Sequence, residues 1–208
     1  MSVDYSLYLL TDRSMLKNID LLTAVEEALQ GGVTLVQLRE KDISSREFYQ
    51  LASELKRLLH SYQVPLIIND RLDIALAVDA DGLHIGQDDL PIGIARRLLG
   101  PDKILGYSVS SVEEARYGQS QGADYLGAGS VYPTGSKADA GTPIGPDKLR
   151  QIKASISIPV VGIGGIGAEN ITEVRKTGVD GVAIISAILG SPDIKESCQN
   201  LLRKWRKP

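Results

Sequence analysis

The chain has 208 residues, of which 43% are hydrophobic and 24% charged, and its net charge is −3. This length and composition predict one globular domain, over residues 1–208, with a full hydrophobic core. The small net charge argues against a nucleic-acid-binding protein, and no apolar run approaches the ~20 residues that a membrane-spanning helix needs.

One cysteine, Cys198, excludes an internal disulfide and a thiolate metal cluster. It falls in the last predicted helix, and we interpret it as a packed core residue. The N-terminus shows no charged segment followed by an apolar stretch and a cleavage site. These features favour a reducing, cytoplasmic location, and the sequence carries no signal for an oligomeric state.

Strand and helix patterns alternate along the chain. Short apolar runs that stop at polar residues predict strands, and apolar residues at helical spacing predict helices. The predicted strands cover residues 7–11, 34–38, 65–68, 82–85, 103–109, 124–130, 159–163 and 181–185. The predicted helices cover residues 21–30, 45–60, a short segment after Asp70, 90–99, 111–121, 147–154, 168–177 and 193–206.

Two helix starts carry a capping-box pattern, Ser44 with Glu47 and Ser111 with Glu114. The longest segment rich in glycine and proline covers residues 133–146. We interpret it as a mobile loop over the site, because the same alternation resumes after it.

Strands separated by helices predict right-handed crossovers and a parallel sheet. Eight such units predict an α/β fold, a compact (β/α)₈ TIM barrel, which normally has about 250 residues. An open doubly wound sheet would need a Gly-x-Gly-x-x-Gly turn after an early strand. The first strand ends in Thr11-Asp12-Arg13 instead. The residues that follow each strand should therefore meet at one mouth of the barrel.

Asp70 and Asp89 follow the third and fourth predicted strands. Two facing carboxylates repel each other unless a proton or a cation lies between them. Oxygen ligands suit Mg²⁺, which usually also binds phosphate. The alternative is that both residues are helix N-caps. Basic residues after the preceding strand favour a metal pair.

A first group of strand-end residues predicts a metal-bound diphosphate site. Gln37, Arg39 and Lys41 alternate in sequence, so they would face the same side. The alternative is that residues 39–42 form a solvated charge run. The group as a whole comprises Gln37, Arg39, Lys41, Asn69, Asp70, Asp89, Ser108, Thr134 and Lys137.

A second group follows strands seven and eight. It comprises Gly164-Gly165 and Ser186-Ala187. Glycine lets a backbone N–H approach a phosphate closely, and these two loops of a barrel often bind one. The alternative is that Gly-Gly forms only a turn. Two anion sites imply two phosphorylated substrates or one long one, and a displacement of pyrophosphate needs no general base. His84 lies within the fourth predicted strand, before its end, and is interpreted as a buried core histidine.

Several motifs, in one order over nearly the whole chain, resemble those of the thiamine-phosphate synthase family. They are Val36-Gln37-Leu38-Arg39-Glu40-Lys41, Ile68-Asn69-Asp70-Arg71, residues 82–89, Gly106-Tyr107-Ser108, residues 133–137 and residues 162–166. Together they are highly specific, although no single motif is.

The resemblance implies a transferase that joins 4-amino-5-hydroxymethyl-2-methylpyrimidine diphosphate to thiazole phosphate, through a pyrimidine-methyl cation, and releases pyrophosphate. By motif, Asp70 and Asp89 would hold Mg²⁺, and Gln37 would hold the pyrimidine. Five residues would bind the diphosphate: Arg39, Lys41, Asn69, Ser108 and Lys137. Thr134, Gly165 and Ser186 would bind the thiazole phosphate, and Ile185 would be a further substrate-binding residue.

Two alternatives remain open. Thiazole tautomerases share the fold but use a histidine just after strand five, where this chain has Ser110. Many synthases also carry a histidine near that position, so Ser110 is a departure from both groups. A phosphate-ligand sensor without catalytic activity would tolerate loss of the metal pair, whereas the synthase would not.

Overall fold

Eight parallel strands form a closed barrel in the computed structural model, which describes residues 3–135 and 142–207. Each strand pairs with its neighbours in chain order, and β8 pairs with β1. The strands are β1 Leu7–Leu10, β2 Leu35–Leu38, β3 Leu66–Asn69, β4 Gly82–Ile85, β5 Ile104–Val109, β6 Tyr125–Gly129, β7 Val160–Ile163 and β8 Gly181–Ile184. The predicted barrel is confirmed.

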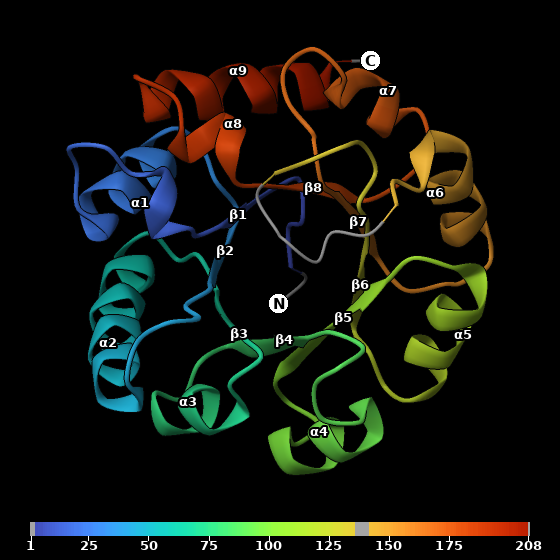
Figure 1. The fold of residues 1–208 in the computed structure, drawn as a ribbon, viewed down its shortest axis with the longest axis horizontal. Coiled ribbons are helices and arrows are strands. Elements are labelled where there is room, and N and C mark those ends of the chain that lie inside the picture. The colour runs from blue at the N-terminus through green and yellow to red at the C-terminus, as the bar shows by residue number, and fades with distance from the viewer. Residues whose placement is uncertain (1–2, 136–141, 208) are drawn as a thin grey trace.

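The helices surround the barrel in chain order (Figure 1). They are α1 Leu21–Gln30, α2 Ser45–Ser61, α3 Leu72–Ala77, α4 Ile92–Leu99, α5 Val112–Ser120, α6 Gly145–Ala154, α7 Ile171–Arg175, α8 Ser186–Leu189 and α9 Ile194–Arg206. A 3₁₀ turn, η1, covers Arg13–Met15. No helix within the described ranges is both long and apolar enough to cross a membrane.

The main error in the predicted helices lies around β7 and β8. The helix expected over residues 168–177 is the shorter α7, because the Asn170 side chain accepts from the Gly167 N–H at 2.9 Å and donates to the Gly165 carbonyl at 2.8 Å. This turn delays the start of the helix. The four-residue α8 was not expected: no element was predicted between the strand over residues 181–185 and the helix over residues 193–206.

The capping boxes are confirmed at one helix and modified at the other. Ser44 and Glu47 cap α2 reciprocally. Ser111 caps α5, but the Glu114 carboxylate accepts from the Ser110 N–H rather than from the cap residue. Cys198 is fully buried on α9, as predicted.

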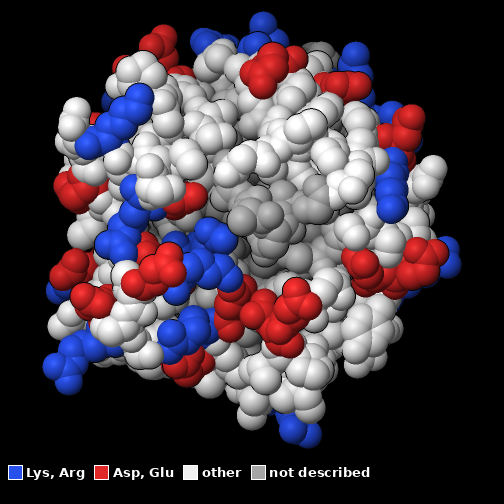
Figure 2. Space-filling model, in the orientation of Figure 1, with Lys and Arg blue, Asp and Glu red and all other residues white. Residues whose placement is uncertain are grey.

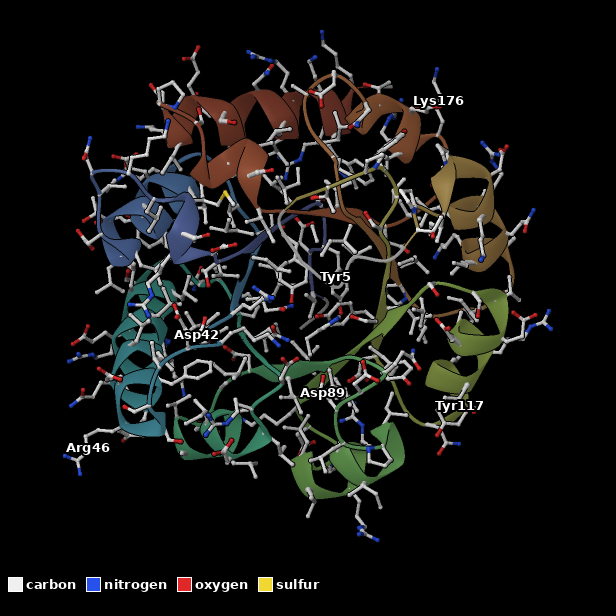
Figure 3. All side chains as sticks on the ribbon, in the orientation of Figure 1. Tyr5, Asp42, Arg46, Asp89, Tyr117 and Lys176 are labelled. Carbon is white, nitrogen blue, oxygen red and sulfur yellow. The ribbon has the colours of Figure 1, made fainter. Side chains whose placement is uncertain are left out.

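Strand register places the polar strand ends at one mouth. Arg39 directly follows β2, Asp70 follows β3, and Asp89 lies in the segment between β4 and α4. Figure 3 shows Asp89 on the barrel side of α4, whereas Arg46, Tyr117 and Lys176 lie on the outer side of the ring. Because the strands are parallel, side chains far apart in sequence meet here.

Candidate active site

A cavity of about 410 Å³ opens at the carboxyl ends of the strands. Charged side chains of both signs gather on its rim beside α2, α3 and α4, whereas the rim beside α8 is largely uncharged (Figure 2). The predicted site residues that line it are Arg39, Lys41, Asn69, Asp70, Asp89, Ser108, Thr134, Gly165, Ile185 and Ser186. Residues from two predicted anion sites therefore share one cavity.

Asp70 lies at the centre of the polar side. The Lys41 ammonium is 2.5 Å from its Oδ2, and the Asn69 side-chain amide donates to its Oδ1. Its backbone has a φ of 60°, in the left-handed region that side-chain-bearing residues seldom adopt. Its own N–H donates to the His84 carbonyl at 2.8 Å, which fixes the turn across to β4.

Asp89 approaches Asp70 from the neighbouring strand end. Its Oδ2 accepts from the Gly86 N–H at 2.7 Å. Burial raises the pKa of the Asp89 carboxyl above its usual value, and the negative charge of Asp70 raises it further, whereas the Gly86 N–H lowers it. Asp70 therefore lies close enough to disfavour the charged form of Asp89.

The helix-capping alternative for these two aspartates is wrong. The N-cap residues of α3 and α4 are Arg71 and Pro91, and neither helix receives a side-chain cap. Asp89 instead closes its own turn through Gly86.

The chemistry of this pair fits Mg²⁺. The described residues contain no group of three or more histidine, cysteine or acidic side chains that could hold a metal. Mg²⁺ typically takes one or two carboxylates and completes its shell with water and phosphate. Asp70 and Asp89, at the edge of a cavity that Arg39 and Lys41 also line, could supply these carboxylates.

The basic side comes mainly from the segment after β2. Arg39 is half-buried, and its backbone N–H donates to the Thr11 hydroxyl at 2.9 Å. The charge-run alternative is wrong for Glu40, whose side chain is only 7% exposed and pairs with Arg13. Lys137 lies outside the described residues.

The second side of the cavity has few charges and many glycines. Gly164 and Gly165 have φ values of 97° and 64°. A Cβ on Gly165 would lie 2.6 Å from the Pro133 carbonyl oxygen, and one on Gly164 would lie 2.2 Å from Ser130 Oγ. Glycine is thus required where the β7 end passes the segment after β6.

Gln37 differs from the other predicted site residues. It is 1% exposed and is not among the residues that line the cavity. Its Nε2 donates to the Tyr8 hydroxyl at 2.6 Å, and its Oε1 has no hydrogen-bond partner among the described residues.

The sequence interpretation missed several lining residues. Gln87 donates to the Ser108 carbonyl at 2.7 Å and accepts from the Tyr107 hydroxyl at 2.9 Å. Ser110 lines the cavity and is tied to Glu114 through its N–H. Ser130, Thr142 and Ile163 also line it. The polar residues following strands were a usable signal for Gln87, but nothing local indicated Ser130.

Comparisons with known proteins agree on one family. The family model described as thiamine monophosphate synthase matches residues 7–188. The thiamine-phosphate synthase of Desulfitobacterium hafniense is 59% identical over 99% of this chain and 100% of its own length. That of Alkaliphilus oremlandii is 56% identical over 96% of this chain and 95% of its own.

Solved structures give the same result. A thiamine phosphate pyrophosphorylase from Pyrococcus furiosus superposes with a TM-score of 0.89 at 43% identity, covering 98% of this chain and 96% of its own. A 3-hexulose-6-phosphate synthase, at 17% identity and a TM-score of 0.70, shares the fold alone. The chain therefore belongs to the thiamine-phosphate synthase family, a family of transferases.

Proposed function

We propose that the chain joins the pyrimidine diphosphate to thiazole phosphate, giving thiamine phosphate and pyrophosphate, with assistance from Mg²⁺. The observation that carries the proposal is the composition of one cavity. Asp70, Asp89, Arg39 and Lys41 lie on one side of it, and Gly165 and Ser186 lie on the other. Family membership supports the same reaction.

The polar side suits a departing diphosphate. Arg39 and Lys41 would donate to its oxygens, together with Asn69 and Ser108, and charge-assisted hydrogen bonds of this kind contribute roughly 1.5–3 kcal/mol each. Lys137 would join them. Asp70 and Asp89 would hold Mg²⁺, which when bound offsets the negative charge that builds up on the leaving diphosphate.

The glycine-rich side suits the second substrate. The backbone N–H groups of Gly165 and Ser186 would bind the thiazole phosphate, with Thr134 and Ile185 beside them. In the displacement, the bond from the pyrimidine methylene carbon to the diphosphate oxygen breaks, and its electrons leave with the diphosphate. The thiazole nitrogen lone pair then forms the new bond to that carbon, so no proton has to be removed by the protein.

The test is pyrophosphate release by the purified protein with both substrates, first with Mg²⁺ and then with excess EDTA. We expect release that needs Mg²⁺ and both substrates, and one thiamine phosphate per pyrophosphate. Reactions that omit one substrate are the control for simple hydrolysis. Binding of the thiazole phosphate without any release would contradict the proposal and favour the sensor.

The tautomerase receives no support from the site. That alternative needs a histidine after β5, and Ser110 at this position is tied to Glu114 on α5.

A further inference from the structure

A chain of four hydrogen bonds crosses the barrel interior. Gln37 Nε2 donates to Tyr8 Oη at 2.6 Å, and Tyr8 Oη lies 2.8 Å from Tyr125 Oη. Tyr125 Oη lies 2.8 Å from His84 Nδ1, and His84 Nε2 lies 2.9 Å from Ser108 Oγ. The chain thus connects residues on five strands, β1, β2, β4, β5 and β6.

Strand register and a missing side chain make room for this chain. His84, Gly106 and Tyr125 are direct partners across β4, β5 and β6. A Cβ on Gly106 would lie 2.3 Å from both His84 Nδ1 and Tyr125 Cζ. Gly127, which lines the cavity, leaves space for the His84 ring in the same way. The His84 ring therefore lies next to a residue of the cavity lining.

The two ends of the chain are unequal. At one end, Ser108 lines the cavity. At the other end, Gln37 Oε1 is buried without a hydrogen-bond partner among the described residues, although Nε2 of the same amide donates to Tyr8 Oη. An unpaired buried carbonyl oxygen is costly, so a ligand donor that reaches it removes that cost.

The direction of donation along this hydrogen-bond chain follows from the protons that each group carries. Burial raises the pKa of the Tyr8 and Tyr125 hydroxyls far above their usual range, so each phenol keeps one proton to donate. Because Tyr8 accepts from Gln37, its own proton goes to Tyr125, and the Tyr125 proton goes to His84 Nδ1. His84 is then the neutral Nε2–H tautomer and donates to Ser108, whose own proton is available to the cavity.

We propose that Tyr8 and Tyr125 are positioning residues that fix the hydrogen-bonding polarity at both ends of this chain. They hold the Gln37 amide with its oxygen available as an acceptor, and they hold Ser108 as a donor toward the diphosphate. The ligand that this polarity selects is a pyrimidine with an amino group, rather than one with an oxo group, at the position facing Gln37. The identity of that ligand rests on the proposed function.

The first test determines the direction of the hydrogen-bond chain without any substrate. The ¹⁵N chemical shifts of the histidine ring nitrogens distinguish the two neutral tautomers and the imidazolium. The protein has two histidines. A His60→Gln variant, altered at an exposed site, therefore assigns the His84 signals. We expect the Nε2–H tautomer in the unaltered protein. An Nδ1–H tautomer or a doubly protonated ring would mean that the chain runs the other way and would overturn the proposal.

The second test measures selectivity. Affinities of the amino-pyrimidine diphosphate and of its oxo counterpart are compared for the unaltered protein, Tyr8→Phe and Tyr125→Phe. Without the Tyr8 hydroxyl the Gln37 amide is free to rotate, and we expect the preference for the amino compound to fall about tenfold.

Tyr5→Phe is the matched control for this second test. Its ring lies 5.0 Å from the Tyr125 ring, near the barrel axis in Figure 3, and the change removes one buried phenol hydroxyl outside the chain. We expect it to keep both the preference and the His84 tautomer.

An equal loss of the preference for the amino compound in Tyr5→Phe and Tyr8→Phe would overturn the positioning role. So would an unchanged preference in Tyr8→Phe. If the protein binds neither pyrimidine, the proposed function fails, and the tautomer measurement still decides the direction of the chain.

Discussion

Lys41 and Asp70, which follow neighbouring strands, form an ion pair with 2.5 Å between Nζ and Oδ2. The Lys41 side chain is 49% exposed and that of Asp70 is 20% exposed. Asp70 also faces Asp89, so Lys41 supplies a positive charge to a carboxylate that has a negative neighbour. Such an exposed pair contributes little to stability, which is consistent with a lysine that can turn toward a ligand.

Replacing either carboxylate of the proposed metal pair should remove most of the Mg²⁺-dependent activity. For Asp70→Asn and Asp89→Asn we expect kcat/KM to fall about a hundredfold or more, since charge stabilisation by a metal is worth several kcal/mol. The measurement is a Mg²⁺ titration of pyrophosphate release. Asp42→Asn, a change of the same kind at an exposed residue outside the cavity lining, should behave like the unaltered protein. Full activity in either site variant would contradict the metal role.

Gly165→Ala should weaken binding of the thiazole phosphate. Its Cβ would meet the Pro133 carbonyl at 2.6 Å and Tyr132 Cβ at 2.8 Å, which pushes the β7 turn out of place. We expect KM for the thiazole phosphate to rise about tenfold or more, because a misplaced binding turn loses hydrogen bonds worth ~1 kcal/mol each. Steady-state kinetics with the pyrimidine held at saturation measure this.

Gly178→Ala is the control for backbone strain in that experiment. Gly178 has a φ of 86°, but its Cβ would meet nothing within 4 Å. The Gly178→Ala variant has the strain of a positive φ without the steric clash, so KM for the thiazole phosphate should not change. A similar rise in both variants would attribute the effect to strain alone.

Gly106→Ala should destabilise the barrel interior. The added methyl group meets His84 and Tyr125 inside a close-packed layer, and overpacking of this kind costs about 1–3 kcal/mol. Urea unfolding measures the loss. Gly162→Ala is a useful comparison, because its Cβ would meet only the side chains of Val174, Leu149 and Ile166, at 3.1 Å or more. A larger loss of unfolding free energy in Gly162→Ala than in Gly106→Ala would show that the interior is less tightly packed around His84 than the distances indicate.

Cys198 should resist alkylation in the folded protein. Burial raises the pKa of its thiol to about 12, so almost no thiolate forms at pH 8. Mass spectrometry after treatment with a maleimide should show no adduct on the folded chain. One adduct should form when the protein is unfolded in guanidinium chloride, which serves as the control. Rapid labelling without denaturant would show that α9 opens locally.

Local patterns were sufficient where a residue's role depends on its near neighbours in sequence. Ser44 and Glu47 specify the start of α2 within one turn. The apolar run over residues 65–68, which stops at Asn69-Asp70, corresponds to β3. The turn at Gly167–Asn170 also depends on nearby residues, but its effect on α7 was missed because an Asn side chain replaced helical backbone partners.

The interior hydrogen-bond chain could not have been predicted in this way. Tyr8 and Tyr125 are 117 residues apart, and their hydroxyls meet only because closure of the barrel places β1 and β6 across the same interior. His84 was correctly interpreted as buried, but its links to Tyr125 and Ser108 depend on the register of three strands.

By itself the sequence determined the alternation of strands and helices, and with it which polar residues follow each strand. Those features arise from spacing and from capping within a few residues. Only the tertiary structure decided that Asp70 and Asp89 face each other instead of capping helices, and that Gln37 lies buried with its amide held by Tyr8. These arrangements are set by contacts between separate strands, whose relative positions are fixed when the whole barrel closes.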